Sequence, residues 1–256
     1  MEVVWLSALA FVAGLVDSVV GGGGLIQVPA LLVLLPPELS SHVALVLGTN
    51  KAASIWGTGM AVARYAPRVR IPWHSILPAA IAAFASAFAG AAAVSMLSSI
   101  ELQPAILVLL VGVAAYTLLR PDLGRLHAPA FTAHKERTVG IVVGAVLGFY
   151  DGFFGPGMGS FLIFTFVGLF GFDFLSASAS AKVINFATNL AALTLFVSTG
   201  AVLYHYAVPM AVCQMGGSIV GTRVAMTRGN GFVRALFLVV SGALILRFAW
   251  QVLAGR

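Results

Sequence analysis

Two aspartates lie beside glycine-rich breaks in otherwise apolar parts of the sequence. Asp17 precedes four consecutive glycines at 21–24, and Asp151 precedes Gly-Pro-Gly at 155–157. A carboxyl group inside a membrane is costly, and a glycine break leaves backbone polar groups that need partners. Burial also raises the pKa of a carboxyl group, which suits a proton carrier near neutral pH. We therefore expect both aspartates to accept a coupling ion, a proton or alternatively sodium. The structural alternative is that each caps a helix end or accepts hydrogen bonds from glycine amides.

Two lysines each begin a polar stripe inside an apolar segment. The spacing is i, i+3, i+7, which places the side chains of a stripe on one helical face. The stripes are Lys51, Ser54 and Thr58 in the first half and Lys182, Asn185 and Asn189 in the second. A lysine that snorkels to the interface, or that pairs with an aspartate, is the alternative. A cation with hydroxyl and amide neighbours is suited to an oxyanion, so the stripes predict an anion site.

The glycine breaks are expected to contribute to the same site. Glycine adopts backbone angles that other residues avoid, and free N–H groups at a helix start favour an anion. Gly22, Gly23 and Gly157 are the candidates, together with Asn50, which neighbours the first lysine. Close packing between helices is the alternative use of these glycines.

Other chemistry is not expected. The sequence contains no Walker A, HExxH or GxSxG motif, and its histidines have no metal-ligand spacing. We therefore predict no enzymatic activity, no cofactor and no metal site. His74 and His205 lie near aromatic residues and are interpreted as interfacial anchors. Gln214 and Arg223 have no counterparts in the first half.

The composition predicts an all-α polytopic membrane protein. Of the 256 residues, 60% are hydrophobic and 9% charged, against roughly 25% charged in a soluble domain. The net charge of +6 does not indicate nucleic acid, because the basic residues cluster in short loops. Ten apolar segments are expected, at 3–20, 24–35, 43–63, 74–97, 102–119, 139–154, 158–170, 176–198, 207–226 and 233–253.

The two halves resemble each other. The first repeat is predicted at 1–119 and the second at 139–256, joined by a cytoplasmic linker at 120–138. Matched residues keep their order at nearly constant offsets: Asp17 with Asp151, Lys51 with Lys182, and His74 with His205. Five segments per half is an odd number, so the second repeat should be inverted. The segments 24–35 and 158–170 are short, and each is either a tilted span or part of a re-entrant hairpin.

Loop charges predict the orientation. Basic residues follow the third and fifth segments and surround the last loop, at Arg64, Arg68, Arg70, Arg120, Arg125, Lys135, Arg137, Arg228 and Arg234. The loops 36–42, 98–101 and 199–206 contain no Lys or Arg. By the positive-inside rule the basic loops are cytoplasmic, so both termini are expected outside.

At these residues the chain resembles the sulfite exporter TauE/SafE family of membrane proteins. The matching stretches are GLVDSVVGGGG at 14–24, GTNKAAS at 48–54, GFYDGFFGPGMG at 148–159 and SAKVINFATNLAAL at 180–193. The family often has threonine before the lysine of the last stretch, where this chain has Ala181. The resemblance implies a secondary carrier that moves small anions, typically sulfite, sulfonates or related sulfur compounds, out across the cytoplasmic membrane of prokaryotes.

The sequence thus predicts an ion-coupled anion exporter with one central site between inverted repeats. Its partners would be a small anion, a coupling proton or sodium ion, the lipid bilayer and possible further copies of the chain. A passive anion channel would use the same basic residues without coupling. A non-transporting scaffold or accessory subunit would need no hydrated polar cavity between the halves.

Overall fold

The computed structural model describes residues 1–95 and 131–253, and these residues form helices and connecting loops without a strand. The predicted segment 102–119 and the loop residues Arg120 and Arg125 lie outside the described part of the chain. The helices, in chain order, are α1 (Glu2–Val20), α2 (Gly24–Leu34), α3 (Pro37–Ser40), α4 (Val43–Tyr65), α5 (Trp73–Ser95), α7 (Ala133–Phe153), α8 (Met158–Gly168), α9 (Phe174–Ser198) and α10 (Tyr204–Leu253).

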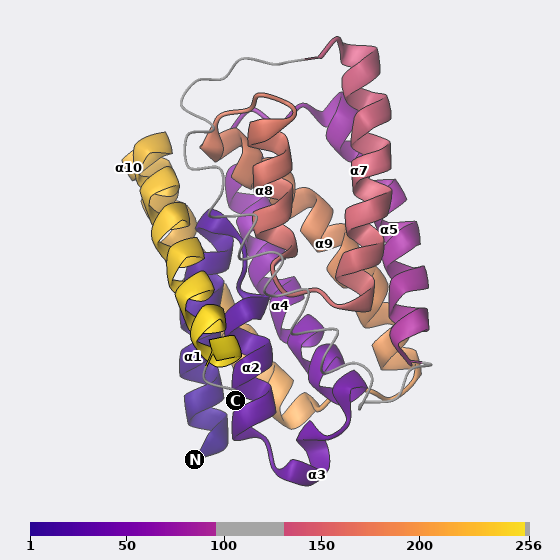
Figure 1. Ribbon diagram of the computed structural model, residues 1–256, viewed down its shortest axis with the longest axis vertical. Helices are drawn as coiled ribbons and strands as arrows, with labels where there is room; N and C mark the ends of the chain where they lie inside the picture. The colour runs from indigo at the N-terminus through magenta and orange to yellow at the C-terminus, as the bar shows by residue number, and fades with distance from the viewer. Residues whose placement is uncertain (96–130, 254–256) are drawn as a thin grey trace.

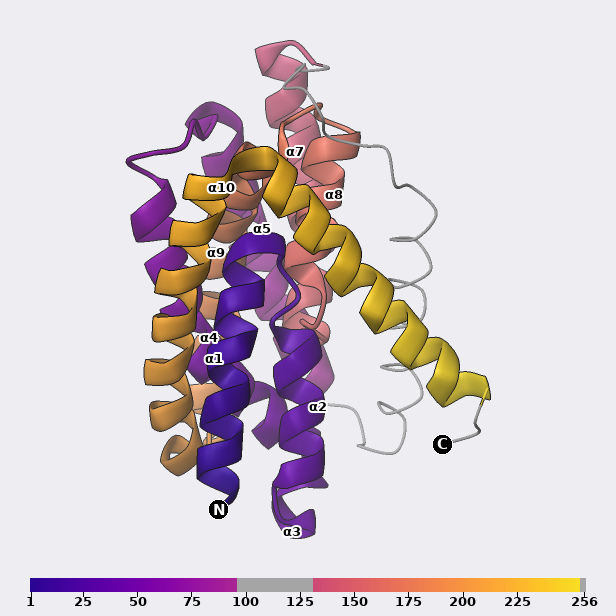
Figure 2. The ribbon, with the colours of Figure 1, turned by 90° about the vertical axis from the view of Figure 1, so that its left-hand side faces the viewer.

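Most helices begin and end within a few residues of the predicted segments. Gly, Pro and polar residues bound the apolar runs and mark these ends in the sequence. Three details differ. The short helix α3 was not expected, and α7 begins at Ala133, six residues before the predicted segment. The last two segments join directly as the two limbs of α10, because only Gly229 has non-helical backbone angles between them (φ 69°, ψ −167°). Figure 2 shows the chain reversing direction at this bend.

The short segments form the second arms of two hairpins. Helices α2 and α8 have 11 residues each, about 16 Å of helix, which is too short to cross a hydrocarbon core of roughly 30 Å. In Figures 1 and 2, α2 turns back along α1 and α8 turns back along α7, and the two hairpins enter the molecule from opposite ends. The observation favours the re-entrant interpretation, whereas the five-plus-five inverted repeat stays a prediction because 96–130 are not described.

Glycine allows both hairpin turns. The residues Gly21, Gly22, Gly155 and Gly157 have positive φ angles between 77° and 92°, a left-handed conformation that is costly for residues with a Cβ atom. Both turns lie in the middle of the molecule (Figure 1), so the ends of four helices meet there.

The most extensive helix pairs, α5 with α7 and α1 with α10, each join elements from different halves of the sequence. Close approach depends on small residues. Along α7, Gly144, Gly148 and Gly152 face the backbone of α5 so closely that an added Cβ would overlap Ala79, Ala83 and Ala87, respectively. The start of α7 is also held, because buried Glu136 accepts a hydrogen bond of 2.6 Å from Ser75 on α5.

Most basic residues of the described loops and helix ends gather at one end of the molecule. They lie in the loop between α4 and α5, in the first turn of α7 and at the bend of α10, and Figure 2 shows these three places at the same end. The start of α1 and helix α3 lie at the opposite end. Among the described helices, α1, α5 up to Val94 and α9 are long and apolar enough to cross a membrane.

Candidate functional site

Helices α4 and α9 carry the two polar stripes and pack against each other in the centre of the molecule. Each polar stripe faces the interior of the molecule. The other faces of both helices are largely apolar and either pack against neighbouring helices or lie at the outer surface. Both lysines are buried, with exposed fractions of 3% for Lys51 and 0% for Lys182. The snorkelling alternative is therefore wrong for these two side chains.

Each lysine instead pairs with the aspartate of the opposite half, which is the other structural alternative expected from the sequence. The Nζ atom of Lys51 lies 2.8 Å from Oδ1 of Asp151, and Nζ of Lys182 lies 2.8 Å from Oδ2 of Asp17. All four side chains are buried, so pairing is required: an isolated charge in this environment would be strongly destabilising. The site as a whole is electrically balanced, with two positive and two negative groups.

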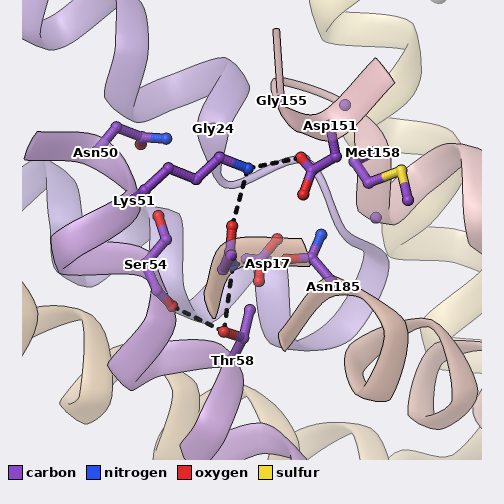
Figure 3. Close-up of a pocket in the computed structure, with 14 residues that line it drawn as sticks. Asp17, Gly24, Asn50, Lys51, Ser54, Thr58, Asp151, Gly155, Met158 and Asn185 are labelled. Atoms are coloured by element: carbon purple, nitrogen blue, oxygen red, sulfur yellow. Dashed lines mark hydrogen bonds and ion pairs between the residues drawn. The ribbon is translucent and has the colours of Figure 1, made fainter. Parts of the chain in front are cut away.

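Amide and hydroxyl groups extend the first ion pair. Lys51 donates a second hydrogen bond of 3.0 Å to Oδ1 of Asn189. The amide nitrogen of Asn189 then donates to Oδ1 of Asn185 at 2.8 Å and to the hydroxyl oxygen of Thr58 at 3.4 Å. Figure 3 shows Lys51 pointing between Asp151 and this network. The two predicted stripes therefore meet across the interface of α4 and α9.

The glycine turns let the charged groups approach the backbone. A Cβ atom on Gly155 would lie 3.1 Å from Nζ of Lys51, and one on Gly159 would lie 3.3 Å from Nζ of Lys182 and 2.8 Å from the backbone of Gly21. The backbone N–H of Gly23 donates to Oδ1 of Asp17 at 3.2 Å. Glycine at 159 is thus needed for the close contact between the two hairpins, and glycine at 155 and 159 leaves room for the two ammonium groups.

A small polar cavity lies between the ion pairs. Its volume, counted as the space that the centre of a water molecule can occupy, is about 20 Å³, which is enough for a water molecule. Its lining comes from α1, α4, α7, α9, both glycine turns and the first residues of α2 and α8: Asp17, Gly22, Gly24, Asn50, Lys51, Ser54, Thr58, Asp151, Gly155, Gly157, Met158, Gly159, Asn185 and Asn189. A larger anion would need the lining to move apart.

Most predicted site residues are brought together. Ten of the twelve line the cavity, and the two exceptions are Lys182 and Gly23, which lie behind Asp17 and contact it. The prediction placed both lysines in one anion cradle, whereas the structure places only Lys51 at the cavity.

A pair of glutamines was not predicted as part of the site. The side chain of Ser54 donates to Oε1 of Gln27 at 3.1 Å, and Nε2 of Gln27 donates to Oε1 of Gln214 at 2.8 Å. The signal in the sequence was present, because each glutamine is an amide side chain inside an apolar segment. Their relation could not be inferred, since 187 residues separate them.

Comparison with known proteins places this arrangement in a family. The family model described as "Sulfite exporter TauE/SafE" matches residues 6–248. A probable membrane transporter protein, ORF9, from Sinorhizobium is 37% identical over 95% of this chain and 90% of its own length. Probable membrane transporter proteins from Haemophilus influenzae (32% identical, 92% of this chain and 90% of the relative) and Escherichia coli (YfcA; 31%, 95% and 88%) are similar too. No solved structure matches the chain significantly.

Proposed function

Because the chain belongs to the sulfite exporter TauE/SafE family and is a membrane transporter, we propose that it exports a small anion by ion-coupled alternating access. Sulfite, an organosulfonate or a related sulfur oxyanion is the proposed cargo. The protein would lie in the cytoplasmic membrane of a prokaryote, with the basic end inside and both termini outside.

The observation that carries the proposal is the crossed pairing of two buried lysines with two buried aspartates. A carboxylate bound to a lysine occupies the place that a substrate oxyanion would take, so the two compete for the same ammonium group. Protonation of the carboxylate removes the competitor and keeps the site electrically balanced when the anion enters. The anion and the proton therefore bind together rather than independently.

Alternating access requires a conformational change around this site. The cavity holds water-sized solutes only, so the anion must enter when the lining opens toward one end of the molecule. The two glycine turns lie at the tips of hairpins that enter from opposite ends. Small displacements of either hairpin against α4 and α9 would expose the site on the corresponding side, as in other carriers with broken helices.

Transport by purified protein in sealed vesicles tests this function. Labelled sulfite or a labelled sulfonate should be taken up when the inward anion gradient is combined with an acidic exterior. The variant Lys51→Ala with Lys182→Ala should lose uptake, and unchanged uptake would contradict the proposed binding chemistry. Lys51→Met with Asp151→Asn should lose it too, without leaving an unpaired buried charge. Exposed Arg68→Ala is the control and should transport normally.

The same vesicles separate a carrier from a passive channel. A coupled carrier accumulates the anion above its external concentration when only a pH gradient is imposed. A channel merely equilibrates the anion along its electrochemical gradient, whatever the pH difference. Absence of accumulation together with rapid equilibration would therefore favour the channel.

A further inference from the structure

The two ion pairs are not equivalent in how fully their carboxylates are bound. Both carboxylate oxygens of Asp17 accept a hydrogen bond: Oδ2 accepts one from Nζ of Lys182 at 2.8 Å, and Oδ1 accepts one from the backbone N–H of Gly23 at 3.2 Å. In Asp151, Oδ1 receives Lys51 at 2.8 Å, whereas Oδ2 has no hydrogen-bond partner within the described part of the chain. Asp151 is only 1% exposed, so this free oxygen is a buried polar atom in need of a proton, a water or a ligand.

The two lysines differ in their access to the cavity. Lys51 lines the cavity and reaches Asn189 as a second acceptor. Lys182 is fully buried and lies outside the lining. The nearby end of α1 is held by two further hydrogen bonds, from Ser178 to the carbonyl of Val19 and from Ser160 to the carbonyl of Val20. The Lys182–Asp17 pair is thus one of several hydrogen-bonded contacts that join α1 to α8 and α9.

A second free oxygen lies at the cavity on the side of Lys51. Oδ1 of Asn50 is buried and accepts no hydrogen bond from the residues that the structure describes. Asn50 and Asp151 both line the cavity. Two unsatisfied buried oxygens, those of Asp151 and Asn50, therefore lie at the cavity beside the Lys51–Asp151 pair, whereas both carboxylate oxygens of Asp17 accept hydrogen bonds.

We propose that only the Lys51–Asp151 pair exchanges during transport, while Lys182–Asp17 stays closed and holds the first hairpin, through α1, against α9. This assignment rests on the proposed function of coupled anion transport. One proton adds to the carboxylate of Asp151, the ion pair opens, and one anion takes the place of the carboxylate on Lys51. The ammonium group keeps its charge throughout, and no covalent bond other than the O–H bond forms or breaks.

The charge balance selects the substrate class. Before exchange, Lys51 and ionised Asp151 sum to zero; afterwards, Lys51, the neutral acid and a monovalent anion also sum to zero. A dianion would leave one uncompensated negative charge in a buried site, which is unfavourable. The site therefore suits a monoanion such as an alkyl sulfonate, carried with one proton in the same direction. Export would be driven by the concentration of the anion inside the cell.

Few other groups can titrate in this environment. Lys51 on α4 is the charged side chain in contact with Asp151. Helices α2 and α8 contain no titratable residue. In α5 the titratable residue is His74, which lies in the first turn, several turns away from the part of α5 that faces Asp151. The remaining titratable groups around the site are Asp17 on α1, Tyr65 on α4, Tyr150 on α7 and Lys182 on α9.

Matched substitutions of the two aspartates test the assignment, with methanesulfonate as the probe because it stays monoanionic across the pH range used. In the wild type, the apparent Kd for methanesulfonate should rise about tenfold per pH unit where the carboxyl group is mostly ionised, since one proton binds with each anion. Asp151→Asn should bind the probe independently of pH and lose accumulation driven by a pH gradient. Asp17→Asn should keep the pH dependence and lower the Tm.

The double variant Lys182→Met with Asp17→Asn removes the second pair without an unpaired charge and covers the case in which Asp17→Asn does not fold. It should retain pH-dependent binding, whereas Lys51→Met with Asp151→Asn should lose binding. Equal loss of pH dependence in both aspartate variants, loss only in Asp17→Asn, or a wild type that binds the probe independently of pH would overturn the assignment. A wild type that neither binds nor transports any of the tested anions would instead overturn the proposed function itself.

Discussion

At the scale of single residues, the charged centre depends on positions where only glycine fits. Gly155 combines a φ of 92° with the approach of Lys51, whose Nζ would lie 3.1 Å from an added Cβ. Both constraints act on the same residue, one on the backbone and one on the ion pair. The sequence indicated a break in the helix at Gly155, but only the fold shows that Lys51 is the side chain that approaches this residue.

Replacing Gly155 by alanine should therefore impair both stability and transport. The left-handed backbone alone costs about 1–2 kcal/mol, and the methyl group also pushes the ammonium group of Lys51, 3.1 Å away, out of its present position beside Asp151. Gly200→Ala is the matched control, because Gly200 has a similar φ of 71° and no atom within 4 Å of its added Cβ. Thermal unfolding should show a loss for both variants, whereas vesicle uptake should fall only for Gly155→Ala. Equal uptake by the two variants would contradict this role.

At the scale of elements, close backbone contact between helices adds to the two clusters of buried apolar side chains. In the face of α7 toward α5, glycine recurs every fourth residue at Gly140, Gly144, Gly148 and Gly152. Helices in a membrane gain little from burying apolar surface away from lipid, so close packing and backbone contacts hold them together. The spacing was visible in the sequence, but the partner helix was not, because α5 belongs to the other half.

The depth of contact varies along this face and gives a graded prediction. Gly152→Ala should destabilise the protein by about 1–3 kcal/mol, since the added methyl group overlaps the backbone of Ala87. Gly140→Ala should be tolerated, because its nearest neighbour, the carbonyl oxygen of Ser75, lies 3.4 Å away. Thermal unfolding in the same detergent compares the two. If Gly140→Ala were the more harmful change, the packing of α5 on α7 would differ from that described here.

At the scale of the whole molecule, the two ends differ in the charge of their loops. The basic loops, which lie far apart in sequence, gather at one end, and the loop that contains α3 lies at the other. Ion pairs and the main helix contacts join residues from different halves. Neither half would bury its own charged residues if it folded alone.

The orientation can be measured by the accessibility of introduced cysteines. After Cys213 is replaced by alanine, a membrane-impermeant thiol reagent should label Ser41→Cys in intact cells, because this loop is predicted to be external. Arg68→Cys should be labelled only after the membrane is opened, since the basic end is predicted to be cytoplasmic. Both residues are exposed, so access should depend on the side of the membrane alone. The reverse pattern would overturn the orientation.

The sequence by itself determined most of the helices, the glycine breaks and ten of the fourteen residues that line the central cavity. It could do so because a charged or amide side chain inside an apolar segment is costly, and the cost marks such positions without knowledge of the fold. It could not determine which lysine meets which aspartate, nor that Lys182 lies behind the cavity while Lys51 faces it. Those facts depend on how the two hairpins pack against α4 and α9 and how these two helices pack against each other. The contact between Lys51 and Asn189, for example, joins residues that are 138 positions apart in the chain. Local patterns do not encode such pairings, because the two halves offer each lysine two chemically identical carboxylates and only the packing of the backbone selects between them.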